Sequence, residues 1–126
     1  MSMGVGVDLV YIPRLKDTAE RWQNRFLNRV FTVAERDICM RYRCPYPHLA
    51  GRFAVKEAVV KALGLSRYQP WSWHDIETLN EASGKPYVRL SGCLAQYAHA
   101  SGSTRVEASI AHDRDYAVAY VVIVGA

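Results

Sequence analysis

Hydrophobic residues follow two different spacings along this chain. Some short stretches alternate apolar and polar residues or are rich in β-branched side chains, as β-strands are. Longer stretches between them repeat apolar residues every three to four positions, as helices do. The expected strands lie at residues 5–10, 75–80, 86–90, 105–111 and 115–124. No repeat, low-complexity tract or long linker divides these segments, so we predict a single domain spanning residues 1–126.

Proline and threonine mark the beginnings of the first two expected helices. Pro13 suits the first turn of a helix that we expect to continue into the late twenties. Thr32 and Glu35 have the spacing of a capping box, in which each side chain accepts a hydrogen bond from the other residue's backbone. A second helix should therefore begin there and end near Tyr42. The capping box accounts for Glu35 without a catalytic role.

A third helix should run from near His48 to Leu63, with Gly64 as its left-handed end. This segment is apolar almost all round, as a buried helix is, yet it carries Glu57 and Lys61 four residues apart on one face. Burying these charges costs several kcal/mol unless partners compensate them. A metal ion at Glu57 and phosphate at Lys61 would compensate both. The alternative is an ordinary exposed ion pair, which contributes about 0.2–0.5 kcal/mol.

The order of these elements indicates the fold class. Helices dominate the first half of the chain, whereas the second half holds strands joined by short connections, with a turn at residues 84–86 and a short helix at residues 91–100. We therefore predict an α+β fold in which an antiparallel sheet packs against the long central helix, rather than a parallel, doubly wound sheet. The apolar strand from Ala117 to Val124 is consistent with a central strand and equally with burial against another subunit.

Composition and cysteine content narrow the class of protein. With 126 residues and 50% apolar side chains, the chain is long enough to form a core. No stretch approaches the length of about 18 apolar residues that a membrane span needs, and the N-terminal segment lacks the pattern of a secretory signal. We therefore expect a cytoplasmic protein without a membrane partner. Cys39, Cys44 and Cys93 have no C-x-x-C spacing, and we expect them to be reduced thiols.

Charge favours an anionic partner. Sixteen Lys and Arg residues against twelve Asp and Glu residues give a net charge of +4 with neutral histidines. A phosphorylated cofactor, an acidic protein and a nucleic acid all fit this charge. Basic and aromatic residues do not interleave along one strand, as they would in an RNA-recognition sheet, and this argues against nucleic acid.

Five short motifs follow one another along the chain, and their order is more specific than any one of them. They are Gly6-Val-Asp8 with the residues up to Arg14, Phe31 to Glu35, Phe53 to Gly64, Gly84-Lys-Pro86, and Ser109 to His112. Together they resemble the holo-[acyl-carrier-protein] synthase family of 4′-phosphopantetheinyl transferases. The resemblance extends over essentially the whole chain, whose length is similar to that of the short, single-domain branch of the family.

The resemblance implies the 4′-phosphopantetheinyl transferase fold and a defined reaction. The 4′-phosphopantetheine arm of coenzyme A is transferred to a serine of an apo acyl carrier protein, and adenosine 3′,5′-bisphosphate is released. This reaction needs no enzyme nucleophile, but it needs a hard cation and basic groups at the phosphate oxygens. The resemblance assigns Mg²⁺ binding and catalysis to Asp8 and Glu57, and the basic catalytic role to Lys61. The serine proton passes either to Glu57 directly or to a metal-bound water.

The resemblance also implies contacts with coenzyme A. Arg52 and Lys56 lie one helical turn apart and could approach its 3′-phosphate, although Lys56 could equally face solvent or a neighbouring subunit. His112 could reach phosphate oxygens. Ala111 stands where family members often carry a hydroxyl residue, so a hydroxyl contact is absent there. The expected substrate-binding residues are Arg52, Lys56, Lys61, Gly64, Gly84, Lys85, Pro86 and His112.

The first expected helix bears on partner choice. Arg21, Arg25 and Arg29 would line one of its faces, with an apolar stripe about 100° away. Such a pattern is either a solvated face opposite a core face or a docking surface for a partner. Because the family docks acidic carrier proteins on this helix, the resemblance implies carrier contacts by Arg14, Arg21, Arg25 and Phe26.

The resemblance further implies a homotrimer with coenzyme A sites between the subunits. Two functions of other classes remain as alternatives, a basic nucleic-acid-binding domain and a noncatalytic carrier-binding protein that retains the fold. The presence of Asp8, Glu57 and Lys61 argues against lost chemistry.

Overall fold

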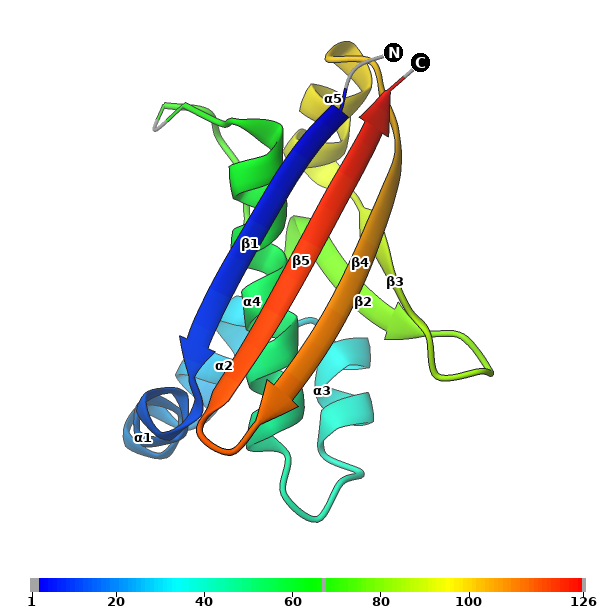
Figure 1. The fold of residues 1–126 in the computed structure, drawn as a ribbon. Helices are drawn as coiled ribbons and strands as arrows, with labels where there is room; N and C mark the ends of the chain where they lie inside the picture. Colours follow the sequence, from blue (N-terminus) through cyan, green and yellow to red (C-terminus); the bar gives the residue numbers. More distant parts are fainter. Residues whose placement is uncertain (1–2, 67, 126) are drawn as a thin grey trace.

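The larger sheet joins the first and last strands of the chain (Figure 1). In this computed structural model, which describes residues 3–66 and 68–125, β1 (Met3–Tyr11) and β4 (Ser103–Asp113) both pair antiparallel with β5 (Tyr116–Gly125). The register places Asp8 and Ile110 on either side of Ala119. β5 is therefore a central strand, which is one of the two interpretations that its apolar sequence allowed.

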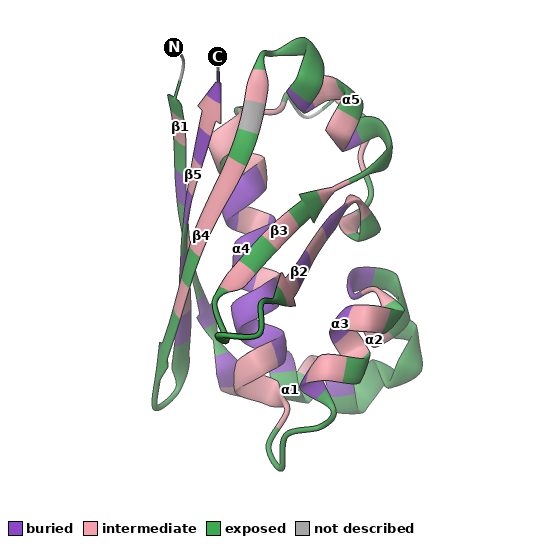
Figure 2. Ribbon diagram, turned by 90° about the vertical axis from the view of Figure 1, so that its right-hand side faces the viewer, coloured by how far each residue is buried: buried purple, intermediate pink, exposed green. Residues whose placement is uncertain are grey.

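The helix α4 (Tyr46–Leu63) lies between two layers of the fold (Figure 2). One side packs against β1 and β5, and the other against α3 (Val33–Cys39) and the small antiparallel sheet formed by β2 (Ile76–Asn80) and β3 (Pro86–Leu90). Leu49, Ala54 and Val59 on this helix are fully buried. Gly64 ends the helix with a φ of 63°, as predicted, because glycine adopts the left-handed conformation without steric cost.

Two glycines on β1 allow the strand to approach α4 closely. A Cβ atom on Gly4 would overlap the carbonyl oxygen of Ala62, and one on Gly6 would overlap the carbonyl oxygen of Ala58. These obstacles belong to the helix backbone, which cannot move aside as a flexible side chain can. The alternation of the strand places Asp8 on the same face as these glycines. The glycines therefore determine how near Asp8 comes to α4.

The first predicted helix is divided into two. α1 (Ile12–Trp22) has Pro13 in its first turn, as expected, but it ends at Gln23, which has a φ of 48°, and α2 (Asn24–Val30) follows in a new direction. A positive φ at a residue other than glycine is uncommon, and nothing in the amino-acid pattern announced it. The prediction of one continuous helix was therefore wrong.

The other predicted elements are present with small changes at their ends. α3 begins after Thr32, where both hydrogen bonds of the capping box with Glu35 are formed, but it ends at Cys39, earlier than the predicted Tyr42. A short 3₁₀ helix, η1 (Trp73–Asp75), precedes β2, and α5 (Gly92–Ala100) connects β3 to β4. The predicted α+β fold, with antiparallel strands packed against a long helix, is confirmed.

The face of the larger sheet that points away from α4 is bare (Figure 2). Large apolar side chains are exposed on this face of the single chain. Met3 is 66% exposed and Leu9 is 62% exposed. Val5, Val7, Tyr116 and Tyr120 are also exposed large apolar residues of β1 and β5. None of the described helices combines the length and the apolar character that crossing a membrane requires.

Candidate active site

Asp8 and Glu57 line the same cavity, although they come from opposite ends of the first half of the chain. β1 supplies Asp8 and α4 supplies Glu57, because the two elements pack directly against each other. The cavity has a volume of about 290 Å³, and its wall also includes Tyr11, Arg14, Phe26 and Phe53. The expectation that these two acidic side chains converge is therefore confirmed. The cavity therefore combines two carboxylates with an aromatic wall.

Lys61 joins this site through Asp8 rather than through Glu57. Its amino group lies 2.9 Å from Oδ1 of Asp8 and donates a second hydrogen bond, of 3.0 Å, to the backbone carbonyl of Val7. The hydrogen bond to Asp8 and the charge of Asp8 raise the pKa of Lys61. The alternative of an ordinary ion pair between Glu57 and Lys61 within one helix is therefore wrong, because Lys61 is paired with the neighbouring strand.

Burial and charge repulsion raise the pKa of Glu57. Burial is the larger cause, the charge of Asp8 adds to it, and the charge of Lys61 opposes both. A divalent cation between the two carboxylates would relieve this repulsion. No group of three or more His, Cys, Asp or Glu side chains that could hold a metal exists within residues 3–66 and 68–125. Two carboxylates suit Mg²⁺, which usually keeps water and substrate phosphates in its remaining positions.

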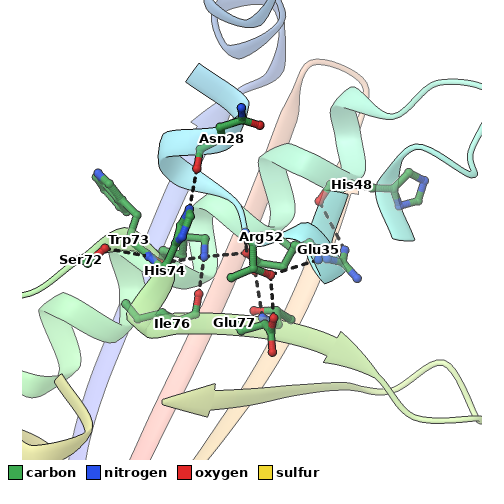
Figure 3. A network of polar contacts seen from close by, with 12 residues as sticks. Asn28, Glu35, His48, Arg52, Ser72, Trp73, His74, Ile76 and Glu77 are labelled. Atoms are coloured by element: carbon green, nitrogen blue, oxygen red, sulfur yellow. Dashed lines mark hydrogen bonds and ion pairs between the residues drawn. The ribbon is translucent and has the colours of Figure 1, made fainter. Parts of the chain in front are cut away.

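Lys56 does not line this cavity and is completely buried, and its acceptors Glu35, Trp73 and Ile76 are labelled in Figure 3. Its amino group lies 2.8 Å from Oε1 of Glu35 and donates hydrogen bonds to the carbonyl oxygens of Trp73, at 3.0 Å, and Ile76. These three acceptors use all three N–H bonds of the ammonium group. The prediction that Lys56 faces solvent or contacts the 3′-phosphate is therefore wrong, because no proton of its amino group is left for a ligand.

Arg52 is also largely buried, with 5% of its surface exposed. Its guanidinium group donates hydrogen bonds to Oδ1 of Asn80, at 2.5 Å, and to the carbonyl oxygen of His48, at 3.4 Å. Asn80 lines a second cavity, of about 400 Å³, together with Arg41, Gly84 and two residues of the α3 region, Ile38 and Tyr42. Arg52 thus supports the wall of a cavity to which Arg41 contributes a cation. Sequence reasoning did not identify Arg41 or Tyr42 as site residues, because it placed them at the end of the second helix and no motif marks them.

The predicted substrate residues in the turn between β2 and β3 lie together, but Gly64 does not join them. Gly84 has a φ of 93° in this turn, Lys85 lies 3.6 Å from Glu107, and Pro86 begins β3. Gly64 ends α4 on the opposite side of the fold (Figure 1). Within one chain, these residues therefore cannot form a single subsite.

His112 belongs to a ring cluster on the far edge of the larger sheet. It lies near the end of β4, whereas Asp8 lies on β1, and β5 separates the two strands. Its ring is perpendicular to that of His48, with 5.6 Å between the centroids, and His48 stacks on Tyr42 at 3.5 Å. Burial, followed by the charges of His112 and Arg52, lowers the pKa of His48. Within one chain, His112 is not part of the Asp8–Glu57 cavity.

The expected carrier-binding residues are divided between two neighbouring cavities and the open surface. Arg14 lines the first cavity, Arg25 lines an adjoining one of about 470 Å³, and Phe26 lines both. Arg21 is exposed at the end of α1 and lines neither cavity. Because α1 and α2 are separate helices, the predicted continuous arginine face does not exist. Trp22, which packs 5.8 Å from the guanidinium carbon of Arg25, takes part in the second cavity.

Comparisons with known proteins identify the family of this chain. Residues 4–121 match the model of the 4′-phosphopantetheinyl transferase superfamily. The chain is 47% identical over 122 residues to the holo-[acyl-carrier-protein] synthase of Protochlamydia amoebophila, covering 97% of this chain and 98% of that protein.

Solved structures give the same result. The synthase of Neisseria meningitidis has a TM-score of 0.86 and 30% identity, covering 95% of this chain and 96% of that one. The synthase of Helicobacter pylori, solved in complex with coenzyme A, has a TM-score of 0.83 and 30% identity, covering 95% and 99%. This chain therefore belongs to the 4′-phosphopantetheinyl transferase superfamily and is similar over its whole length to holo-[acyl-carrier-protein] synthases.

Proposed function

We propose that this enzyme transfers the 4′-phosphopantetheine arm of coenzyme A to a serine of an apo acyl carrier protein in a Mg²⁺-dependent reaction that releases adenosine 3′,5′-bisphosphate. The observation that carries this proposal is the shared cavity of Asp8 and Glu57, with Lys61 bound to Asp8. Membership of the superfamily supports the reaction type, and the coenzyme A complex of the Helicobacter pylori relative supports the donor.

Asp8 and Glu57 would hold Mg²⁺, which neutralises charge on the diphosphate oxygens when it is bound. Lys61 would leave Asp8 and donate a hydrogen bond to a phosphate oxygen of the donor, because its flexible side chain is 55% exposed. The carrier serine attacks the β-phosphorus as the bond to the leaving bisphosphate breaks. Its proton passes to the carboxylate of Glu57, directly or through an ordered water. Phe26 and Phe53 exclude bulk water from this side of the cavity.

The carrier protein would dock beside this cavity. Arg14 and Arg25 present positive charge on α1 and α2, and Phe26 lies between their two cavities. An acidic carrier fits this surface by charge complementarity. Arg21 adds charge at the exposed end of α1 and increases the rate of encounter rather than the strength of the docked contact.

The enzyme would act as a homotrimer in the cytoplasm. The bare face of the larger sheet supports assembly, because several large apolar side chains are exposed together on it, as they are at subunit interfaces. The positions of His112 and Asp8 on opposite edges of the sheet also support it, since one copy could bring His112 beside the Asp8 of its neighbour. The cavity lined by Arg41 and Gly84 would then add cationic surface for the nucleotide part of coenzyme A.

Mass spectrometry of an apo acyl carrier protein tests the reaction. With the wild-type enzyme, coenzyme A and Mg²⁺, the carrier should gain the mass of one phosphopantetheinyl group. Chelation of Mg²⁺, or the Glu57→Gln substitution, should abolish the gain. A carrier that a known synthase modifies, but that this enzyme leaves unchanged at any Mg²⁺ concentration, would contradict the proposal.

A further inference from the structure

The ion pair between Lys56 and Glu35 is the most deeply buried charged contact among the described residues. Both side chains have no exposed surface, and the N–O distance is 2.8 Å. Lysine and glutamate are seldom fully buried, because both lose hydration that only well-placed partners can replace. The proposed reaction uses neither side chain. A contact of this kind therefore needs an explanation of its own.

The polar atoms of the pair bond to several segments of the fold, and Glu35, Trp73 and Ile76 are labelled in Figure 3. The carboxylate of Glu35 accepts hydrogen bonds from the backbone N–H groups of Thr32, at 3.0 Å, and Thr78, at 2.9 Å, in addition to its contact with Lys56. The ammonium group of Lys56 donates to the carbonyls of Trp73 and Ile76. The pair thus connects α4 to the start of α3, to η1 and to β2.

This junction lies next to the candidate metal carboxylate. Lys56 directly precedes Glu57, and the two side chains leave α4 about 100° apart. Any rotation of α4 about its axis would move both side chains together. Because Lys56 is bound to three acceptors outside its helix, these contacts oppose a rotation of α4 that would turn Glu57 away from Asp8.

Two aromatic walls of the active-site cavity depend on the same junction. Trp73, whose carbonyl accepts from Lys56, packs its ring 5.3 Å from that of Phe53. The ring of Phe31 lies 5.9 Å from the amino group of Lys56 and meets Phe26 edge to face at 6.2 Å. Phe53 and Phe26 both line the cavity that holds Asp8 and Glu57.

We propose that Lys56 and Glu35 are positioning residues of the active site. Their buried pair holds α4 in the rotation that directs Glu57 at Asp8, and it supports Phe26 and Phe53 as walls of the cavity. Lys56 does not bind coenzyme A. This inference rests on the proposed function only in taking Asp8 and Glu57 as the metal ligands, and it adds a role for two residues that touch neither metal nor substrate.

The test uses a neutral double variant, Glu35→Gln with Lys56→Met, so that neither charge is left buried alone. Binding of Mn²⁺ is measured by titration calorimetry without turnover, and kcat and KM for coenzyme A are measured with Mg²⁺. We expect metal affinity to fall by about 10- to 100-fold and kcat to fall with it, since loss of outer contacts to metal ligands has effects of this size. KM for coenzyme A should change by less than about threefold at saturating metal, because no substrate contact is removed.

A matched control removes an exposed pair of the same composition. Lys16 and Glu20 lie 4.0 Å apart on the surface of α1, and Lys16→Met with Glu20→Gln should leave metal affinity and kcat unchanged. A folded Glu35/Lys56 variant with wild-type metal affinity and kcat would overturn the proposal and leave the pair as a contributor to stability only. A tenfold rise in KM for coenzyme A with unchanged metal affinity would also overturn it, in favour of substrate binding by Lys56.

Glu35→Asp is the second variant, because it keeps both charges and withdraws the carboxylate by one methylene group. This variant replaces the double variant in the test if circular dichroism shows that the double variant does not fold. Metal affinity should fall in the same direction and by a smaller factor, and an unchanged affinity and kcat overturn the proposal. Metal binding is measured without turnover. A wild-type enzyme that binds Mn²⁺ but is inactive would therefore contradict the proposed reaction, while the role of the buried pair could still be tested by metal affinity.

Discussion

The amino group of Lys61 lies 2.9 Å from Oδ1 of Asp8, although 53 residues separate the two in the chain. In the free enzyme, the positive charge of this ammonium group partly compensates the negative charges of Asp8 and Glu57. The same position at Asp8 is where a divalent metal ion would bind. Under the proposed function, Lys61 and the metal compete for Asp8, and metal binding would release Lys61 toward the substrate phosphates.

Replacing Lys61 by Met should separate metal binding from catalysis. Metal affinity of the free enzyme should rise by about two- to fivefold, because the competing cation at a partly exposed pair is gone. The kcat for transfer should fall by about 100-fold, because a donor at the phosphate oxygens is lost. Calorimetry with Mn²⁺ and steady-state kinetics measure the two effects. Weaker metal binding would show that Lys61 supports the ion instead, and Lys16→Met controls for the change in net charge.

Gly6→Ala should disturb the site through the backbone. The added methyl group would overlap the carbonyl oxygen of Ala58, so β1 must move away from α4 and take Asp8 with it. We expect a loss of about 1–3 kcal/mol in the free energy of unfolding, together with weaker metal binding.

Gly51→Ala is the matched control for this change. Its Cβ atom would lie 2.7 Å from Cγ2 of Ile110 on β4, so this clash involves neither β1 nor Asp8. Urea unfolding should therefore respond to both substitutions, whereas metal titration should show a smaller effect for Gly51→Ala than for Gly6→Ala. Equal metal affinity in both variants and in the wild type would exclude close strand–helix packing as the determinant of the Asp8 position.

The parts of the site that sequence predicted correctly depend on local signals. The spacing of Thr32 and Glu35 specifies a capping box, and Gly64 specifies a helix end, because both are interactions between residues close in sequence. The convergence of Asp8 and Glu57 is long-range, and it followed from the family resemblance rather than from periodicity.

The wrong predictions concern contacts between segments that are distant in sequence. Periodicity showed that Lys56 points away from Glu57, but not that the carbonyls of Trp73 and Ile76 would meet it there. Buried lysine is uncommon enough that exposure was the natural expectation. The break at Gln23 has no sequence signal either, because glutamine seldom adopts the positive φ that it has there.

The imidazole of His48 should remain neutral to lower pH than an ordinary histidine. Burial disfavours its charged form, and the nearby His112 and Arg52 add to the effect, so its pKa lies below 6.5. The unfolded chain therefore binds more protons than the folded chain between this lowered value and the ordinary one. The contribution to stability is fully present above about pH 6.5 and is lost as the pH falls through that window.

An NMR titration of the imidazole C–H signals measures this midpoint directly. His112→Gln should raise the midpoint of His48, because one neighbouring charge is removed, whereas His99→Gln on α5 should leave it unchanged. A His48 midpoint at or above 6.5 in the wild type would contradict the described burial of the ring.

Charge reversal on α1 and α2, where we propose that the carrier docks, should raise KM for the carrier protein more than KM for coenzyme A. Arg25→Glu should raise KM for the carrier by about five- to tenfold, or about 1–1.4 kcal/mol, because Arg25 lines a cavity beside the active site. Arg14→Glu should act similarly, whereas Arg21→Glu should have a smaller effect, because Arg21 lines neither cavity. Arg89→Glu on β3 is the control for net charge. Equal changes in KM for both substrates would refute carrier docking at this surface.

Substitutions on the bare face of the larger sheet test whether this face forms the subunit interface. Leu9→Glu and Tyr120→Glu place charges among exposed apolar residues of β1 and β5, and both should convert the proposed trimer to monomers in light-scattering measurements. The monomers should keep the wild-type circular dichroism spectrum and lose transferase activity, because His112 would no longer approach the Asp8 of a neighbouring copy. Ser101→Glu, after α5, adds the same charge away from this face and should leave the trimer intact. A folded monomeric variant with full activity would show that one chain contains the complete site and that His112 has no part in it.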